Sequence, residues 1–120
     1  QPELLILDEP TTGLDYRECT RIMEYIETFH RKGATVVIVC HDMEVVLDYT
    51  DEVIVMSGGH LIRKGETAEI FRDAETLRAA SLLPPQMIDL AGRLGGEYSG
   101  IARVEEMRDA IVRNRKAVRA

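Results

Sequence analysis

The 120-residue sequence lacks several features that would each point to a particular class of protein. No apolar run approaches the roughly 20 residues that cross a bilayer, and no basic-then-apolar segment opens the sequence, so we expect neither a membrane span nor a secretory signal. The only two cysteines, Cys19 and Cys40, have no partners at metal-site spacing, which favours free, buried thiols in a reducing compartment. Basic residues are not in excess, and the net charge of −6 disfavours nucleic-acid binding through phosphate neutralisation.

The composition that remains is that of an ordinary soluble globular protein. Apolar residues make up 45% and charged residues 30%, and 120 residues suffice for one domain with a modest core. Gln1 and Pro2 lead directly into an apolar stretch, with no initiator methionine. We therefore expect a fragment of a longer protein.

The stretch LLILDEPTTGLD, residues 4–15, places two carboxylates at the end of an apolar run. Leu4 to Leu7 predict a short strand buried on both faces, as in a parallel sheet. Asp8 and Glu9 follow at the carboxyl edge, where ligands bind in open α/β sheets. Two acids there suit Mg²⁺-assisted phosphoryl transfer, one holding the metal and the other polarising a water. The alternative is that both are merely solvated residues between strand and loop.

The twelve residues together resemble the Walker B strand and D-loop of ATP-binding-cassette (ABC) ATPases. In that family four apolar residues precede Asp-Glu-Pro, a short turn ends in Leu-Asp, and a helix follows. The resemblance implies that ATP and Mg²⁺ are the cofactors and that Asp8 binds the metal through water. It also implies that Glu9 is the general base for the attacking water. Asp15 would be the D-loop acid that works at the nucleotide across a dimer interface.

The next segments predict a helix and a second buried strand. Asp15 and Glu18 form a capping-box pattern, and Gly33 supplies the carboxyl-terminal cap. Between them apolar residues recur at helical spacing: Cys19, Ile22, Met23, Ile26 and Phe29. The β-branched run from Thr35 to Cys40 predicts a strand buried on both faces, so the order is one right-handed βαβ unit. This unit places His41 at the same sheet edge as the acid pair.

His41 is the second candidate catalytic residue. Standing alone, a histidine before Asp42 could be an ordinary surface residue at a strand end. The sequence VIVCHD, however, resembles the H-loop of ABC ATPases, which implies that His41 hydrogen-bonds the γ-phosphate and orients the attacking water. Asp42 then caps the next helix. We expect the inward stripe of that helix to be Met43, Val46, Leu47 and Thr50.

The rest of the chain predicts a hairpin and a helical extension. Val53–Met56 and His60–Lys64 are strands joined by a glycine turn, and Thr67 caps a helix through Phe71. Three helical pieces are then expected: Leu77–Leu82, a helix lined by Met87, Ile88, Ala91 and Leu94, and one striped by Val104, Met107 and Ile111. The segments SLLPPQMIDLAGRLG and VEEMRDAI resemble the carboxyl-terminal extension of energy-coupling-factor ATPases, which include the cobalt-type importers. The predicted division is residues 1–72, half of an ABC ATPase core, and residues 73–120, the extension.

The phosphate-binding half of an ATPase site is missing from the sequence. Nothing resembles the GxxxxGK[ST] loop, the Q-loop or the LSGGQ-type signature, so we expect this chain alone neither to bind nucleotide tightly nor to hydrolyse it. In the family the phosphate-loop strand lies between the switch-histidine strand and the next one. We therefore expect Thr35–Cys40 and Val53–Met56 to lie near each other without a direct hydrogen-bonded ladder, or to be bridged by another chain.

The sequence thus predicts an α/β fold: a partial P-loop NTPase parallel sheet with flanking helices, a β-hairpin and a small helical extension. The predicted function is the ATP-hydrolysing subunit of an ABC importer, at the cytoplasmic face of the membrane. Its expected partners are a second ATPase subunit and transmembrane transporter subunits, with no nucleic acid. The alternatives are an ABC ATPase of DNA repair or chromosome maintenance, and a truncated, non-catalytic module that pairs with an intact ATPase.

Overall fold

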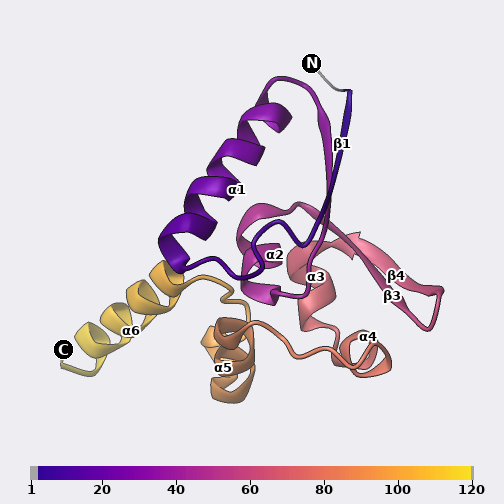
Figure 1. Ribbon diagram of the computed structural model, residues 1–120. Helices are drawn as coiled ribbons and strands as arrows, with labels where there is room; N and C mark the ends of the chain where they lie inside the picture. Colours follow the sequence, from indigo (N-terminus) through magenta and orange to yellow (C-terminus); the bar gives the residue numbers. More distant parts are fainter. Residues whose placement is uncertain (1–2, 120) are drawn as a thin grey trace. The chain divides into compact units, whose positions relative to one another are not determined.

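The computed structural model describes residues 3–119, which divide into two compact units on either side of the Thr50–Asp51 bond (Figure 1). The first unit carries the acid pair and His41. The second carries the hairpin and the later helices.

The first unit is a strand–helix–strand–helix arrangement. Its elements are β1 (Leu4–Asp8), α1 (Tyr16–Arg31), β2 (Thr35–Val39) and α2 (Met43–Tyr49). β1 and β2 pair in parallel, with Leu4 opposite Thr35 and Asp8 opposite Val39. Figure 1 shows α1 lying alongside this strand pair. The predicted parallel pairing is confirmed, and it brings the carboxyl ends of both strands to one edge.

The two ends of α1 follow from its sequence. The Asp15 carboxylate accepts a hydrogen bond from the Glu18 backbone N–H at 2.9 Å, and the Glu18 carboxylate accepts one from the Asp15 N–H at 3.2 Å. This reciprocal capping box satisfies amide groups that the first helical turn leaves unpaired. After Arg31, Gly33 adopts a φ of +94°, which glycine tolerates without a steric cost. Both predicted caps are confirmed.

The β1–β2 pair is covered on one face only. Met23, Ile26 and Val45 form the buried core under that face, packed against Leu7, Cys19, Val36, Ile38, Cys40 and Tyr49. The opposite face is open, with exposed fractions of 53% for Leu4, 63% for Ile6, 43% for Val37 and 53% for Val39. The prediction that both strands are buried on both faces is therefore wrong. The reason is that α1 and α2 both pack on the same face of the strand pair.

Two helical stripes in this unit also differ from the prediction. Ile22 of α1 is 37% exposed, so the inward face of the helix is narrower than expected. In α2 the buried residues are Val45 and Leu47, whereas Met43 and Val46 are only partly buried and Thr50 lies beyond the helix end.

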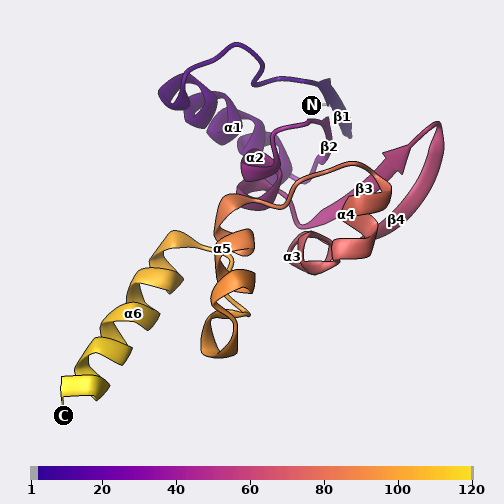
Figure 2. The ribbon, with the colours of Figure 1, turned by 90° about the horizontal axis from the view of Figure 1, so that it is seen from below.

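The second unit begins with an antiparallel hairpin. β3 (Glu52–Ser57) and β4 (His60–Glu66) pair across Gly58 and Gly59, whose φ values of +56° and +79° fit a tight turn. Figure 2 shows the twisted hairpin with the next two helices beside it. These two helices are α3 (Thr67–Arg72) and α4 (Ala74–Ala79). The remaining elements of the unit are α5 (Gln86–Leu94), the 3₁₀ helix η1 (Gly96–Tyr98) and α6 (Val104–Arg119). The predicted hairpin and the helix predicted to contain Met87 to Leu94 are confirmed.

The helical part corrects several predictions. Thr67 is the first residue of α3 and is buried, so the cap position falls to Glu66. The helix predicted over Leu77–Leu82 starts earlier, because Asp73 caps its amino terminus, and it ends at Ala79. The small core of α5 and α6 consists of Ala91, Ile101, Met107 and Ala110. Three residues predicted to face inward are instead exposed: Leu94, Val104 and Ile111.

The described strands form two separate two-stranded sheets, β1–β2 and β3–β4. β2 lies in the first unit and β3 in the second, so the expected relation between these two strands stays a prediction. The predicted domain boundary after residue 72 falls inside the second unit and also stays a prediction. Of the helices in residues 3–119, none combines the length and the apolar character that a bilayer crossing requires.

Asp73 ties the hairpin to α4. Its carboxylate accepts hydrogen bonds from the Thr76 hydroxyl at 2.6 Å and from the Glu75 and Thr76 backbone amides, and it pairs with Arg63 of β4. The Thr76 hydroxyl and amide, followed by the Arg63 guanidinium, lower the Asp73 pKa from 3.8 to about 2. One side chain therefore caps a helix and anchors it to the neighbouring strand.

We expect Asp73→Asn to lower the thermal midpoint of the complete protein. The asparagine oxygen can still accept from the helix amides, but its nitrogen replaces the carboxylate oxygen that accepts from the Thr76 hydroxyl and pairs with Arg63. A depressed folded-state pKa contributes stability above 3.8 that disappears as pH falls towards 2. The difference between wild type and variant should thus be constant from neutral pH to about pH 4 and shrink below it. Thermal unfolding across this pH range measures it.

Asp51→Asn is the matched control, because Asp51 is an exposed aspartate of the same unit. We expect that variant to unfold with the wild type at every pH. An Asp73→Asn deficit that is equally large at pH 2 and pH 7 would contradict the electrostatic explanation.

Candidate active site

The carboxyl ends of β1 and β2 are held together by one further backbone hydrogen bond beyond the ladder. The Glu9 N–H donates to the Val39 carbonyl oxygen at 2.8 Å. This bond continues the parallel register past Asp8 and sets Glu9 beside the segment that contains His41. The predicted meeting of Glu9 and His41 at one sheet edge is confirmed.

Glu9 and His41 form a direct side-chain contact. The His41 Nδ1 atom lies 2.8 Å from the Glu9 Oε1 atom, with side chains 76% and 33% exposed, respectively. The hydrogen bond from His41 is the main cause that lowers the Glu9 pKa below 4.5. The same bond, with the negative charge of Glu9, raises the His41 pKa above 6.5. Glu9 is therefore ionised at neutral pH, and His41 holds its proton more strongly than a free imidazole does.

The backbone at Glu9 is unusual. Its φ is +48°, in the left-handed region where a residue other than glycine stores about 1–3 kcal/mol of strain. Two backbone bonds hold it there: its N–H donates to Val39, and its carbonyl accepts from the Thr12 N–H at 3.3 Å. The strained conformation turns the chain sharply at the end of β1, and so presents the Glu9 side chain at the carboxyl edge of the sheet.

Thr12 also reaches the Glu9 side chain. Its hydroxyl donates to the Glu9 Oε2 atom at 3.1 Å, so each carboxylate oxygen of Glu9 has one partner. Sequence reasoning missed this residue. The signal that could have found it is a hydroxyl three residues after an acid in a turn, a spacing at which side chains bond locally.

Asp8 lies on the open side of the strand pair. Side chains alternate along a strand, and Asp8 shares its exposed face with Leu4 and Ile6. The described residues contain no group of three or more histidine, cysteine, aspartate or glutamate side chains that could hold a metal ion. A single carboxylate still fits Mg²⁺, because this ion usually keeps several waters and binds one or two carboxylates together with substrate phosphates.

Asp15 is engaged at the start of α1. Its carboxylate caps that helix, and among the described residues no contact joins it to Glu9 or His41. Asp42 likewise caps α2, accepting hydrogen bonds from the Glu44 and Val45 amides at 3.1 and 3.3 Å. These two acids fix the helices on either side of the edge. A role for Asp15 at a nucleotide stays a prediction.

The two cysteines lie next to this site but are free and partly buried. Burial is the largest effect on both and raises the pKa of each thiol. The Cys40 Sγ atom accepts a hydrogen bond from the Asp42 N–H at 3.3 Å. Thiols that resist ionisation make poor nucleophiles, so Cys19 and Cys40 act as packing residues here.

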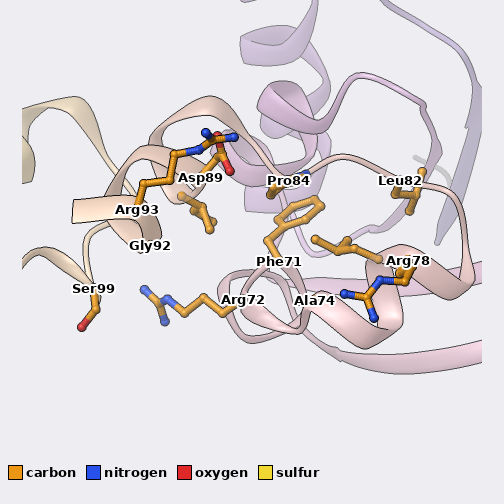
Figure 3. Close-up of a pocket in the computed structure, with 12 residues that line it drawn as sticks. Phe71, Arg72, Ala74, Arg78, Leu82, Pro84, Asp89, Gly92, Arg93 and Ser99 are labelled. Atoms are coloured by element: carbon orange, nitrogen blue, oxygen red, sulfur yellow. The ribbon is translucent and has the colours of Figure 1, made fainter. Parts of the chain in front are cut away.

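A separate pocket of about 530 Å³ lies in the second unit (Figure 3). Its lining combines apolar side chains with arginines: Phe71, Leu77, Ile88, Arg72, Arg78 and Arg93. Arg72 donates to the Gly100 carbonyl oxygen at 2.6 Å, and Arg93 pairs with Asp89 at 2.8 Å. Two of these three arginines are therefore already bonded to groups of the same unit. The sheet edge with Glu9 and His41 remains the candidate active site.

The solved structures that resemble this chain define a class of protein. CbiO1 from Clostridium perfringens, part of the ABC transporter complex CbiONQ, matches 78% of this chain and 36% of its own at 35% identity, with a TM-score of 0.55. MJ1267, an ATP-binding cassette of an ABC transporter, matches 64% of this chain and 32% of its own at 27% identity, with a TM-score of 0.57. The structure is thus part of an ABC ATPase domain, as predicted.

Sequence relatives narrow the class. The energy-coupling factor transporter ATP-binding protein EcfA of Methanothermobacter thermautotrophicus is 45% identical over 94 residues, which cover 78% of this chain and 30% of EcfA. No protein-family model matches the chain. The chain is homologous to ABC transporter ATP-binding proteins, and its match spans about a third of the length of EcfA and CbiO1.

The ion pair makes a direct prediction for pH titration. We expect the His41 pKa in the nucleotide-free complete protein to exceed 6.5, and Glu9→Gln to lower it because the negative partner charge is lost. The pair is fully charged between the lowered pKa of Glu9 and the raised pKa of His41, so its contribution fades as pH rises through the latter. An NMR titration of the His41 imidazole measures the shift.

Glu24→Gln is the control, since Glu24 is exposed on α1 and carries the same charge. It should leave the His41 titration unchanged. A His41 pKa that is the same in wild type and Glu9→Gln would show that the two side chains do not interact in solution.

Proposed function

We propose that this chain is part of the ATP-hydrolysing subunit of an ABC importer and that it supplies the acid pair and switch histidine of the catalytic site. The observation that carries the proposal is the 2.8 Å contact between Glu9 and His41 at the carboxyl ends of adjacent parallel strands. This edge is where α/β sheets bind their ligands. Homology to ABC transporter ATP-binding proteins supports the same reading.

Glu9 is proposed as the general base. Its lowered pKa keeps the carboxylate ionised at neutral pH, so it can accept a proton from an attacking water. Its orientation is fixed by partners on both oxygens, and its backbone is fixed by the bond to Val39. A rigidly held base loses little freedom when the reaction begins.

His41 is proposed to orient the phosphate and the water. With the raised pKa of the imidazole, His41 carries a positive charge over a wider pH range and can donate a hydrogen bond to a phosphate oxygen. Its 76% exposure leaves it free to turn towards such a group. The contact between Glu9 and His41 is then the resting arrangement. During hydrolysis Glu9 would act on the attacking water and His41 on the phosphate.

Asp8 is proposed to hold Mg²⁺ through water. When bound, this ion neutralises charge that develops on the phosphate oxygens during transfer. Asp8 contributes an exposed carboxylate on the open face of β1, where other ligands can approach it. The residues that bind the ATP phosphates would come from the parts of the protein that this chain does not span.

The complete protein would work as a dimer with membrane partners. Asp15 would act in the D-loop at the interface with a second ATPase subunit. ATP binding would close the dimer and hydrolysis would reopen it, and transmembrane subunits would convert this motion into uptake of a solute or ion. We place it at the cytoplasmic face of the membrane, in an energy-coupling-factor type of importer. Similarity to EcfA, an energy-coupling factor transporter ATP-binding protein, supports this type.

Glu9→Gln in the complete protein should leave ATP binding intact and slow hydrolysis at least about a hundredfold, which is the usual contribution of a general base. His41→Ala should slow it comparably, since the water and phosphate lose their orienting group. Single-turnover hydrolysis and equilibrium binding of ATP measure the two effects separately.

Two control variants carry the same chemical changes elsewhere. Glu24→Gln alters an exposed glutamate of α1, and His60→Ala alters an exposed histidine of β4, so both should hydrolyse ATP at the wild-type rate. Near-normal turnover of Glu9→Gln would refute the assignment of Glu9 as the base.

A further inference from the structure

The two oxygens of the Glu9 carboxylate are held from two different parts of the chain. Oε1 contacts His41, which follows β2, and Oε2 accepts from the Thr12 hydroxyl, which lies in the turn after β1. A carboxylate with one partner can still rotate about that bond. Two partners on different oxygens fix the plane of the group as well as its position.

Thr12 is itself fixed relative to Glu9. Its N–H donates to the Glu9 carbonyl oxygen at 3.3 Å, so the residue that orients the side chain also closes the backbone turn that begins there. The next turn follows at once, because Leu14 N–H donates to the Thr11 carbonyl at 3.2 Å and Gly13 has a φ of +79°. The Thr12 hydroxyl is therefore carried by a short segment in which backbone hydrogen bonds close two successive turns.

We propose that Thr12 is a positioning residue for the catalytic base: its hydroxyl holds the Glu9 carboxylate in the plane in which a free lone pair meets the attacking water. This inference rests on the proposed function of Glu9. Thr12 would continue to hold Glu9 after His41 turns to a phosphate. Of the two side-chain contacts that the structure describes on Glu9, the bond from Thr12 is the one that then remains.

The competing explanation is that the hydroxyl only stabilises the turn. The two explanations differ in what they predict for hydrolysis. A turn-stabilising hydroxyl affects folding whether or not position 9 carries a carboxylate, whereas a positioning hydroxyl affects kcat only through Glu9. Valine has nearly the shape of threonine without the hydroxyl, and serine keeps the hydroxyl without the methyl group.

In the complete protein we expect Thr12→Val to lower kcat about tenfold, the effect of losing one hydrogen bond to a charged group, with the KM for ATP unchanged. Thr12→Ser should retain most of the wild-type kcat. Thermal midpoints of both variants should match the wild type, since Thr12 is exposed. An equal decrease of kcat in both variants, or a change in KM without a change in kcat, would overturn the proposal.

A double-mutant cycle separates this inference from the function on which it rests. In the Glu9→Gln background, Thr12→Val should cause no further loss of hydrolysis, because the group that it positions is already disabled. If Glu9→Gln hydrolyses ATP normally, the proposed function fails. If Glu9→Gln is slow but Thr12→Val is as fast as wild type, the function stands and the positioning role fails.

A crystal structure of the nucleotide-free complete protein supplies a readout that does not depend on activity. In Thr12→Val we expect the Glu9 carboxylate to occupy more than one rotamer, and in Thr12→Ser a single one. A Glu9 side chain that keeps one conformation in Thr12→Val would overturn the proposal.

Discussion

The candidate site depends on the parallel pairing of β1 with β2 and on the bond that extends it, from the Glu9 N–H to the Val39 carbonyl. Glu9 and His41 are 32 positions apart in the sequence, yet this register leaves their side chains within hydrogen-bond distance. The register is set by apolar side chains of both strands that pack under α1 and α2. The buried core of the first unit therefore determines the geometry of an exposed acid–histidine pair.

Much of this arrangement could be predicted from local patterns. The capping box of α1, the glycine turns and the order of strand, helix and strand depend on neighbouring residues, so the sequence displays them directly. The approach of His41 to Glu9 also followed, because parallel strands end at one edge. Thr12 was harder to predict, since its contact depends on the left-handed backbone at Glu9, a conformation that the sequence does not mark.

Burial was predicted less well, for a physical reason. Apolar runs such as Leu4 to Leu7 indicate strands that prefer cover on both faces, but they do not say which residues provide that cover. Here α1 and α2 cover one face, and Leu4 and Ile6 remain exposed on the other. The same limit applies to α6, where Met107 and Ala110 are buried but Ile111 of the expected stripe is not. Periodicity identifies an apolar face, whereas burial depends on what packs against it.

A structure of the complete protein with Mg²⁺ and a non-hydrolysable ATP analogue tests the central claim most directly. We predict that the γ-phosphate lies at the carboxyl ends of β1 and β2, with His41 within hydrogen-bond distance of it and Glu9 beside the water that would attack. We also predict that Asp8 contacts the metal through an ordered water. A nucleotide bound away from this edge, or a Glu9 carboxylate turned away from the γ-phosphate, would contradict the account.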